Sequence, residues 1–93
     1  MSYLLLRSSA FVRDAKRAVR KQPGLADQLR QALDLLEADP FAPVLKSHKL
    51  KGALRDSWAC SGGYDLRIVF SFTEYCGKPA ILLQSVGTHA EVY

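Results

Sequence analysis

The chain has 93 residues, of which 48% are hydrophobic, enough for one compact core and too few for a second. Its net charge of +4 at pH 7 is compatible with a polyanionic partner but does not require one. The apolar runs at 4–6 and 80–83 are far shorter than the roughly 20 residues that span a bilayer, and Arg7 interrupts the first where a secretory signal would continue. We therefore expect a single domain over residues 1–93, in the cytoplasm and without a membrane partner.

The first forty residues predict a short strand followed by two helices. Tyr3–Leu6 has the length and apolar content of a strand, and Ser8 or Ser9 can cap the helix that follows. Gln-Pro-Gly at 22–24 breaks this helix, and Asp39-Pro40 ends a second one that begins near 25. Apolar residues recur at helical spacing in both: Phe11, Ala15 and Ala18, then Leu29, Ala32, Leu33 and Leu36. The pair must bury these stripes against another element.

The second half predicts strands joined by turns. Residues 40–54 contain two prolines and predict a loop, followed by a strand at 57–61 and a glycine-containing turn at 62–65. The strand at 66–73 alternates strictly, with Leu66, Ile68, Phe70 and Phe72 on one face and Arg67, Val69 and Ser71 on the other. A turn at 74–79 and a last strand at 80–86 complete the chain. The order indicates an α+β fold, with a helical hairpin packed on a mainly antiparallel sheet of about four strands.

The cysteines and histidines lack the spacing of a metal site. Cys60 and Cys76 are too far apart for a CxxC motif, and His48 and His89 are scattered relative to them. We expect two reduced thiols, no metal and no cofactor.

Positive charge is concentrated in the second half. Between residues 46 and 67 the cations outnumber the carboxylates Asp56 and Asp65, and they are Lys46, Lys49, Lys51, Arg55 and Arg67. A polyanion would be drawn to this segment. The first helix is also basic, which is usual for a solvated helix face.

Two histidines are the candidates for proton transfer near neutral pH. The sequence contains no nucleophile elbow, phosphate-binding glycine loop or HExxH motif, so any catalysis must use dispersed residues. His89 follows the last predicted strand, and His48 lies in a lysine-flanked stretch. Taken alone, each is better explained as an exposed polar residue without a role.

Four segments in the second half, taken in order, identify a family. They are Ser-His-Lys-Leu-Lys-Gly at 47–52, Trp-Ala-Cys at 58–60, Asp-Leu-Arg-Ile-Val-Phe at 65–70 and Gly-Thr-His-Ala-Glu-Val-Tyr at 87–93. Together they resemble the RelE/StbE branch of the RelE/ParE toxin superfamily, close to the YafQ-like toxins. The resemblance covers Tyr3 to Tyr93 and implies a RelE-like fold.

The resemblance implies the toxin of a type II toxin–antitoxin system that inhibits translation by cutting mRNA, usually on the ribosome. In such an endoribonuclease (mRNA interferase) the ribose 2′-hydroxyl attacks the adjacent phosphate without a metal, leaving 2′,3′-cyclic phosphate and 5′-hydroxyl ends. The matching positions imply His89 as general acid, His48 as base or phosphate ligand, Asp65 as base or orienting group, and Tyr93 as a stacking surface. By charge and position, Lys49, Lys51 and Arg55 would hold the RNA backbone, and Arg67 would lie beside the scissile phosphate.

The chain departs from the YafQ-like pattern at three positions. Ser61 and Leu66 stand where these toxins have a histidine and a tryptophan, and Ser85 stands where they have an arginine, four residues before the C-terminal histidine. Arg67, which alternates to the polar face, is our candidate replacement for that arginine.

Partners and alternatives follow from the same resemblance. We expect a cognate antitoxin that covers the basic face and displaces RNA, and promoter DNA bound only through the antitoxin complex. One alternative is a non-enzymatic, ParE-like inhibitor of DNA gyrase, which the shared fold permits. Another is a degenerate toxin that acts only with its antitoxin as a repressor.

Overall fold

The structure, a computed structural model, describes residues 2–52, 56–63 and 65–88. Two helices and five strands lie within these residues, together with one short 3₁₀ helix, η1. In chain order they are β1 (Leu4–Arg7), α1 (Ser9–Lys21), α2 (Leu25–Ala38), η1 (Pro43–Leu45), β2 (His48–Lys49), β3 (Trp58–Ser61), β4 (Leu66–Tyr75) and β5 (Lys78–Thr88). The α+β class and the placement of the helices confirm the sequence prediction.

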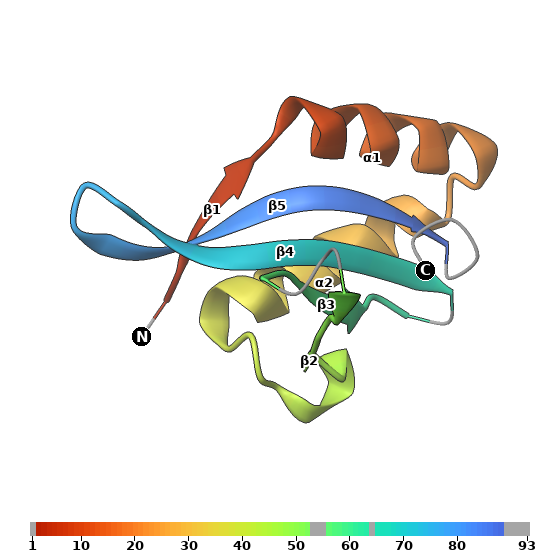
Figure 1. The fold of residues 1–93 in the computed structure, drawn as a ribbon. Coiled ribbons are helices and arrows are strands. Elements are labelled where there is room, and N and C mark those ends of the chain that lie inside the picture. The colour runs from red at the N-terminus through yellow and green to blue at the C-terminus, as the bar shows by residue number, and fades with distance from the viewer. Residues whose placement is uncertain (1, 53–55, 64, 89–93) are drawn as a thin grey trace.

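The strands form one sheet in the order β1-β5-β4-β3-β2 (Figure 1). β1 is parallel to β5, and the other neighbours are antiparallel. The prediction of about four strands was one too few, because residues 40–54 are not all loop. His48 and Lys49 pair with Ala59 and Trp58 and form the short edge strand β2. Two residues are too few to show the period-two pattern that identifies a strand in a sequence. The extended conformation of β2 is therefore determined by its pairing with β3.

β4 and β5 extend beyond their predicted ends and meet in a two-residue turn. A turn was predicted over 74–79, but Tyr75 still pairs with Lys78. The turn residues Cys76 and Gly77 have φ of 53° and 77°. Positive φ at both central residues matches the twist of the flanking strands and defines a tight hairpin. Backbone hydrogen bonding therefore continues past the point where the apolar alternation ends.

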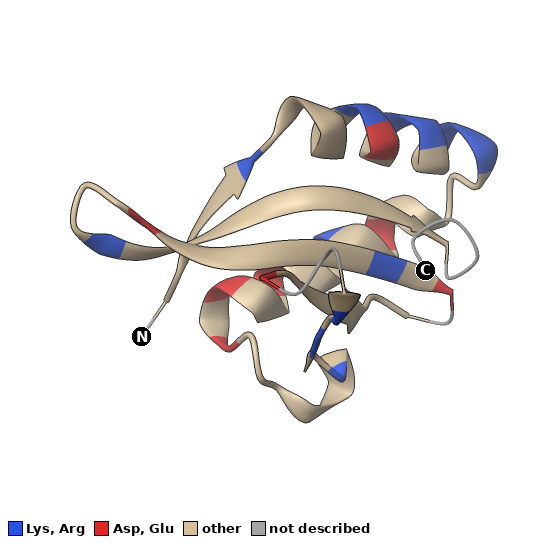
Figure 2. Cartoon of the chain, in the orientation of Figure 1, with Lys and Arg blue, Asp and Glu red and all other residues tan. Residues whose placement is uncertain are grey.

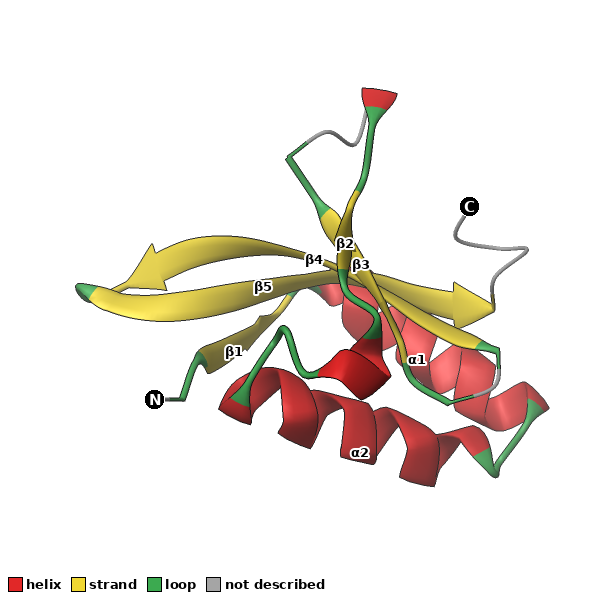
Figure 3. Ribbon diagram, turned by 90° about the horizontal axis from the view of Figure 1, so that it is seen from below, coloured by secondary structure: helices red, strands yellow, loops and turns green. Residues whose placement is uncertain are grey.

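Both helices pack on the same face of the sheet (Figure 3). Ser8 caps α1, because its hydroxyl accepts a hydrogen bond from the backbone N–H of Phe11 at 3.0 Å. Phe11 and Leu36 are buried against Ile68 and Phe70 of β4. The predicted alternation of β4 is confirmed, and its other face is turned away from the helices.

A β-bulge in β5 adjusts which residues face the core. Val69 pairs with Ser85, whereas Phe70 pairs with Leu83, so Gln84 is the extra residue. The bulge lets Leu83 and Val86 both join the buried cluster although they are three residues apart. It also places Ser85 opposite Val69, on the face away from the helices.

In the part of the chain that the structure describes, no helix is both long and apolar enough to cross a membrane. A groove of about 640 Å³ lies between β1, α1 and α2. None of the residues predicted for the site lines this groove.

Candidate active site

The face of the sheet turned away from the helices, here called the open face, brings predicted site residues together. Residues directly opposite one another in antiparallel strands have side chains on the same face. His48 pairs with Ala59 and Ala59 with Val69, so His48 shares a face with Val69. Arg67 shares that face because it is two residues from Val69 in β4. His48 and Arg67 therefore lie on one face, across two strand spacings.

Ala59 and Val69, which are 0% and 4% exposed, separate the two. The row through His48 continues through Ala59 and Val69 to Ser85, and the row through Arg67 contains Ser61 and Gly87. From strand spacings of about 4.8 Å and a rise of about 3.3 Å per residue, the Cα atoms of His48 and Arg67 are roughly 12 Å apart. A ligand in contact with both side chains must extend across β3 and the adjoining part of β4, as a nucleic-acid strand can.

The backbone conformation before β2 determines how the His48 ring is presented. Lys46 has a left-handed φ of 52° at the end of η1, and its carbonyl oxygen lies 3.1 Å from His48 Nδ1. A carbonyl can only accept a hydrogen bond, so the neutral ring must carry its proton on Nδ1. Nε2 then carries the lone pair of the neutral ring, and the side chain is exposed.

Asp65 and Arg67 lie at the start of β4. Arg67 is partly buried, and its Nη1 donates a hydrogen bond of 3.0 Å to the carbonyl oxygen of Leu66. Leu66 pairs with Thr88, the last residue of β5. The described part of β5 therefore ends beside Leu66, between Asp65 and Arg67 in the chain. His89, Tyr93 and Arg55, which were predicted as site residues, lie outside the described residues.

The sequence profile described as "Bacterial toxin of type II toxin-antitoxin system, YafQ" matches residues 3–93. The chain belongs to this family. It is thus a member of the YafQ toxins of type II toxin–antitoxin systems, as the resemblance of its segments indicated. A comparison with curated proteins found no match.

Solved structures of similar toxins have the same fold. YafQ from Escherichia coli strain BL21(DE3) is 19% identical with a TM-score of 0.78, and 98% of each chain is covered. YafQ in the E. coli DinJ-YafQ toxin-antitoxin complex is 19% identical with a TM-score of 0.76, over 100% of this chain and 99% of that one. A metal-bound toxin from Helicobacter pylori is 29% identical with a TM-score of 0.75, over 100% of each chain. The RelE-like fold is therefore confirmed.

This YafQ-family chain departs from the YafQ-like pattern on both faces of the sheet. Leu66, in place of a tryptophan, is 1% exposed and belongs to the core. Ser61 and Ser85 instead lie on the open face, where Ser61 pairs directly with Arg67. Ser85 is diagonal to Arg67 across β4 and β5, at a Cα separation of roughly 7–8 Å. The one cation of β4 on this face is thus next to both Ser61 and Ser85.

The lysines after η1 do not all lie on the open face. Lys49 pairs with Trp58, which packs against the core, so Lys49 projects from the opposite face to His48. Lys51 is exposed beyond the end of β2. Figure 2 shows positive charge around β2 and along α1. Of the described cations in the predicted basic segment, Lys46, Lys49 and Lys51 therefore lie at the β2 edge of the sheet, whereas Arg67 lies in the middle strand β4.

Sequence reasoning missed a polar pair on the open face. Ser57, only 5% exposed, donates a hydrogen bond of 2.8 Å from its hydroxyl to Gln84 Oε1. Ser8 donates from its hydroxyl to the carbonyl oxygen of Gln84 at 3.2 Å, which ties the bulge to the start of α1. The pair spans β4 beside Val69. A glutamine within the apolar run of the last strand was the available signal.

The two thiols differ in environment. Cys60 and Cys76 are both free, but Cys60 is buried and Cys76 is exposed in the hairpin turn. Burial raises the pKa of the Cys60 thiol from 9.0 to about 12, against a smaller lowering by the Arg67 guanidinium. Cys60 is therefore a protonated core residue rather than a nucleophile. Within the described ranges, no group of three or more His, Cys, Asp and Glu residues could hold a metal ion.

Proposed function

We propose that this toxin is an endoribonuclease that cuts mRNA through the open face of its sheet. The observation that carries the proposal is that His48 and Arg67 lie on the same face of the sheet, with Ala59 and Val69 between their strands. A single RNA strand laid across β3 and β4 contacts a proton acceptor at one end and a fixed cation at the other. Membership of the YafQ toxin family supports the same activity.

The proposed reaction is a transfer of the phosphoryl group within the RNA. His48 Nε2 or the Asp65 carboxylate takes the proton of the ribose 2′-hydroxyl, and the 2′-oxygen attacks the adjacent phosphorus. His89 donates a proton to the departing 5′-oxygen. The products are a 2′,3′-cyclic phosphate and a 5′-hydroxyl, with no metal in the reaction. Arg67 stabilises the charge that develops on the phosphate oxygens.

Arg67 is proposed to replace the arginine that YafQ-like toxins carry in the last strand. Its diagonal position relative to Ser85 lets a long guanidinium side chain reach the same part of the open face from the neighbouring strand. Its hydrogen bond to the carbonyl oxygen of Leu66 uses Nη1 and leaves Nη2 and Nε as further donors for phosphate oxygens.

RNA-backbone binding is assigned to Lys49, Lys51 and Arg55, and base stacking to Tyr93. We further propose that the toxin acts on the ribosome and is neutralised by a cognate antitoxin that covers the basic face. The E. coli DinJ-YafQ complex supports an antitoxin partner. Promoter DNA would be bound only through the antitoxin complex.

The test is to map RNA ends after induction in cells and in a purified reaction that contains a chelator. We expect growth inhibition, cyclic phosphate ends, and loss of both in His89→Ala. If His89→Ala inhibits growth as strongly as the parent, the assigned mechanism is wrong. DNA breaks with intact translation would instead indicate a gyrase inhibitor, and harmless expression without an antitoxin would indicate a degenerate toxin.

A further inference from the structure

An aromatic cluster lies on the opposite side of β2 from His48. The Phe41 ring stacks on Phe72 with centroids 5.7 Å apart at 24°, and it meets Trp58 edge-on at 5.3 Å and 78°. Phe72 is held in turn by Trp58 and by the fully buried Phe70, at 5.6 Å in each case. Phe41 itself remains 53% exposed. An exposed ring therefore rests on a rigid aromatic wall that is anchored in the core.

Backbone contacts place Phe41 beside β2. The backbone N–H of Phe41 donates to Asp39 Oδ1 at 3.0 Å, which fixes the turn after α2. The Ser47 hydroxyl donates to the carbonyl oxygen of Pro40 at 2.6 Å, which ties this turn to the residue just before His48. Lys49 is opposite Trp58 in the sheet and shares its face. Phe41, Trp58 and Lys49 thus form one surface, here called the Phe41 platform.

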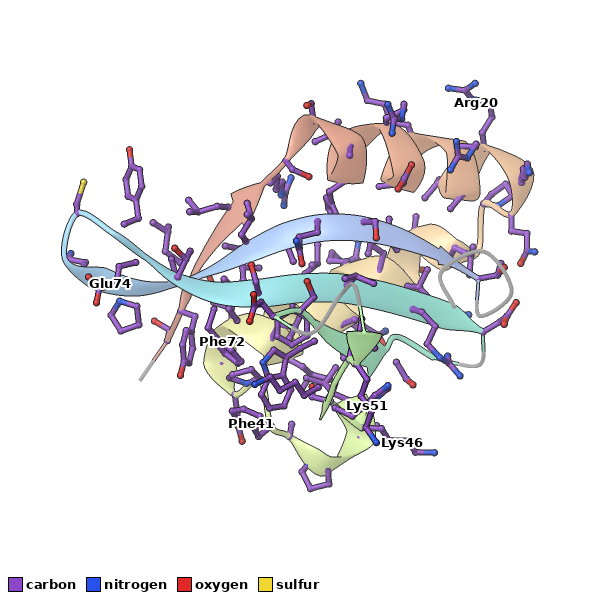
Figure 4. The ribbon with its side chains drawn as sticks, in the orientation of Figure 1. Arg20, Phe41, Lys46, Lys51, Phe72 and Glu74 are labelled. Carbon is purple, nitrogen blue, oxygen red and sulfur yellow. The ribbon has the colours of Figure 1, made fainter. Side chains whose placement is uncertain are left out.

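Charges of both signs lie near the Phe41 platform. Lys49 shares the face of Trp58, Lys46 and Lys51 are exposed on either side of β2, and the Asp39 carboxylate lies next to Phe41. In Figure 4 Phe41 lies below Phe72, and Lys51 and Lys46 lie to the right of the two rings. Aromatic rings flanked by cations are the usual surface for single-stranded nucleic acid, because every base has a face that can stack and every nucleotide has a phosphate.

The Phe41 platform is separated from the open face only by the edge of the sheet. β2 is the last strand in the sheet and has two residues, whose side chains point to opposite faces. An RNA strand held at His48 therefore needs to pass over one edge strand to reach Lys49 and Phe41. The same edge would stop a rigid duplex, which cannot turn so sharply.

From this juxtaposition we infer that Phe41, supported by Trp58 and assisted by Lys49, stacks on a base of single-stranded RNA that flanks the nucleotide cut on the open face. The inference rests on the proposed ribonuclease function and adds a second contact to it. Stacking of this kind is tolerant of base identity, so the Phe41 platform contributes affinity and position rather than sequence preference.

The experiment measures binding of fluorescent oligonucleotides that are 2′-O-methylated to prevent cleavage. We expect Phe41→Ala to weaken binding of a long oligonucleotide about ten-fold, Phe41→Leu to weaken it similarly, and Phe41→Tyr to bind like the parent. A trinucleotide confined to the open face should bind all four proteins alike. Trp58 is the single tryptophan of the chain, so quenching of its emission by the long oligonucleotide reports contact at the Phe41 platform.

Tyr75→Ala is the matched control, because Tyr75 is 54% exposed but lies at the end of β4 beside the hairpin turn. Its affinity for RNA should equal that of the parent, and thermal melts show whether each variant is folded. Unchanged RNA affinity in Phe41→Ala overturns the inference while the proposed function stands. Weaker binding of antitoxin alone assigns the surface to a protein partner and also overturns it. If the parent protein binds and cleaves no RNA, the proposed function itself fails.

Discussion

At the scale of the residue, the orientation of one imidazole decides what His48 can do. The hydrogen bond from Nδ1 to the Lys46 carbonyl oxygen selects the tautomer of the neutral ring. Lys46 can provide this acceptor because its left-handed φ of 52° turns the chain sharply just before β2.

We predict that His48→Gln lowers the single-turnover rate of cleavage about 100-fold, because glutamine can hydrogen bond but cannot take a proton at neutral pH. The measurement is single-turnover cleavage of a defined oligonucleotide at neutral pH. A cleavage rate in His48→Gln equal to that of the parent would assign the base to another group, with Asp65→Asn as the next variant.

Arg67 is the residue whose role the structure makes most testable. We predict that Arg67→Ala slows cleavage about 100-fold, because a developing negative charge loses its fixed cation. Adding Ser85→Arg to this variant should restore a large part of the rate, since position 85 is diagonal to 67 on the open face. Ser71→Arg, on the same face of β4 but further along it, is the control and should restore nothing. Equal rates with and without Ser85→Arg would refute the replacement.

At the scale of the element, the β4–β5 hairpin determines the register of the open face. The two-residue turn aligns Tyr75 with Lys78 and the bulge at Gln84 then shifts the register between Phe70 and Val69. Both the turn and the bulge are needed to place Ser85 opposite Val69 and Gly87 opposite Arg67. A substitution in the turn should therefore change the free energy of unfolding more than the rate of RNA cleavage.

We predict that Cys76→Asn stabilises the protein by roughly 0.5 kcal/mol, because Asn adopts positive φ more readily and Asn-Gly is the preferred pair for this turn. Gly77→Ala should destabilise it by about 1 kcal/mol. Nothing lies within 4 Å of a Cβ built at Gly77, so this cost would come from its φ of 77° and not from a clash. Urea unfolding measures both changes, and equal stability of all three proteins would contradict the turn geometry.

At the scale of the whole molecule, the sheet and the helices together bury Cys60. Burial raises its pKa from 9.0 to about 12, so the folded state retains a proton that the unfolded state loses above pH 9. Since the unfolded state then binds fewer protons than the folded state, stability must fall as pH rises from 9 towards 12.

We predict that the Cys60 thiol lowers the free energy of unfolding by about 1.4 kcal/mol between pH 8 and pH 10. Cys60→Ala should lack this part of the pH dependence, although it is less stable at pH 8 because it leaves a small cavity. Cys76→Ala is the matched control and should keep the parent's dependence. If the free energy of unfolding falls equally with pH in the parent and in Cys60→Ala, the pKa of the Cys60 thiol is not raised in the folded protein.

The sequence alone predicted the helices, the strand alternation of β4 and the family to which the chain belongs. These features depend on local patterns: the stripe through Ala32 and Leu36, the cap at Ser8 and the alternation from Leu66 to Phe72. The two residues of β2 could not be predicted, because their conformation depends on pairing with β3. The single-domain assignment and the roles of His89 and Tyr93 stay predictions.

The sequence by itself determined which chemical groups the toxin has, His48, Asp65, Arg67 and the lysines among them, and that β4 has one apolar and one polar face. Only the tertiary structure decided which of these groups meet. It brought His48 and Arg67 to one face, moved Lys49 to the other, and placed Ser85 next to Arg67 through a bulge at Gln84. The physical reason is that side-chain direction in a sheet is determined by register, and register depends on hydrogen bonds between strands distant in the chain.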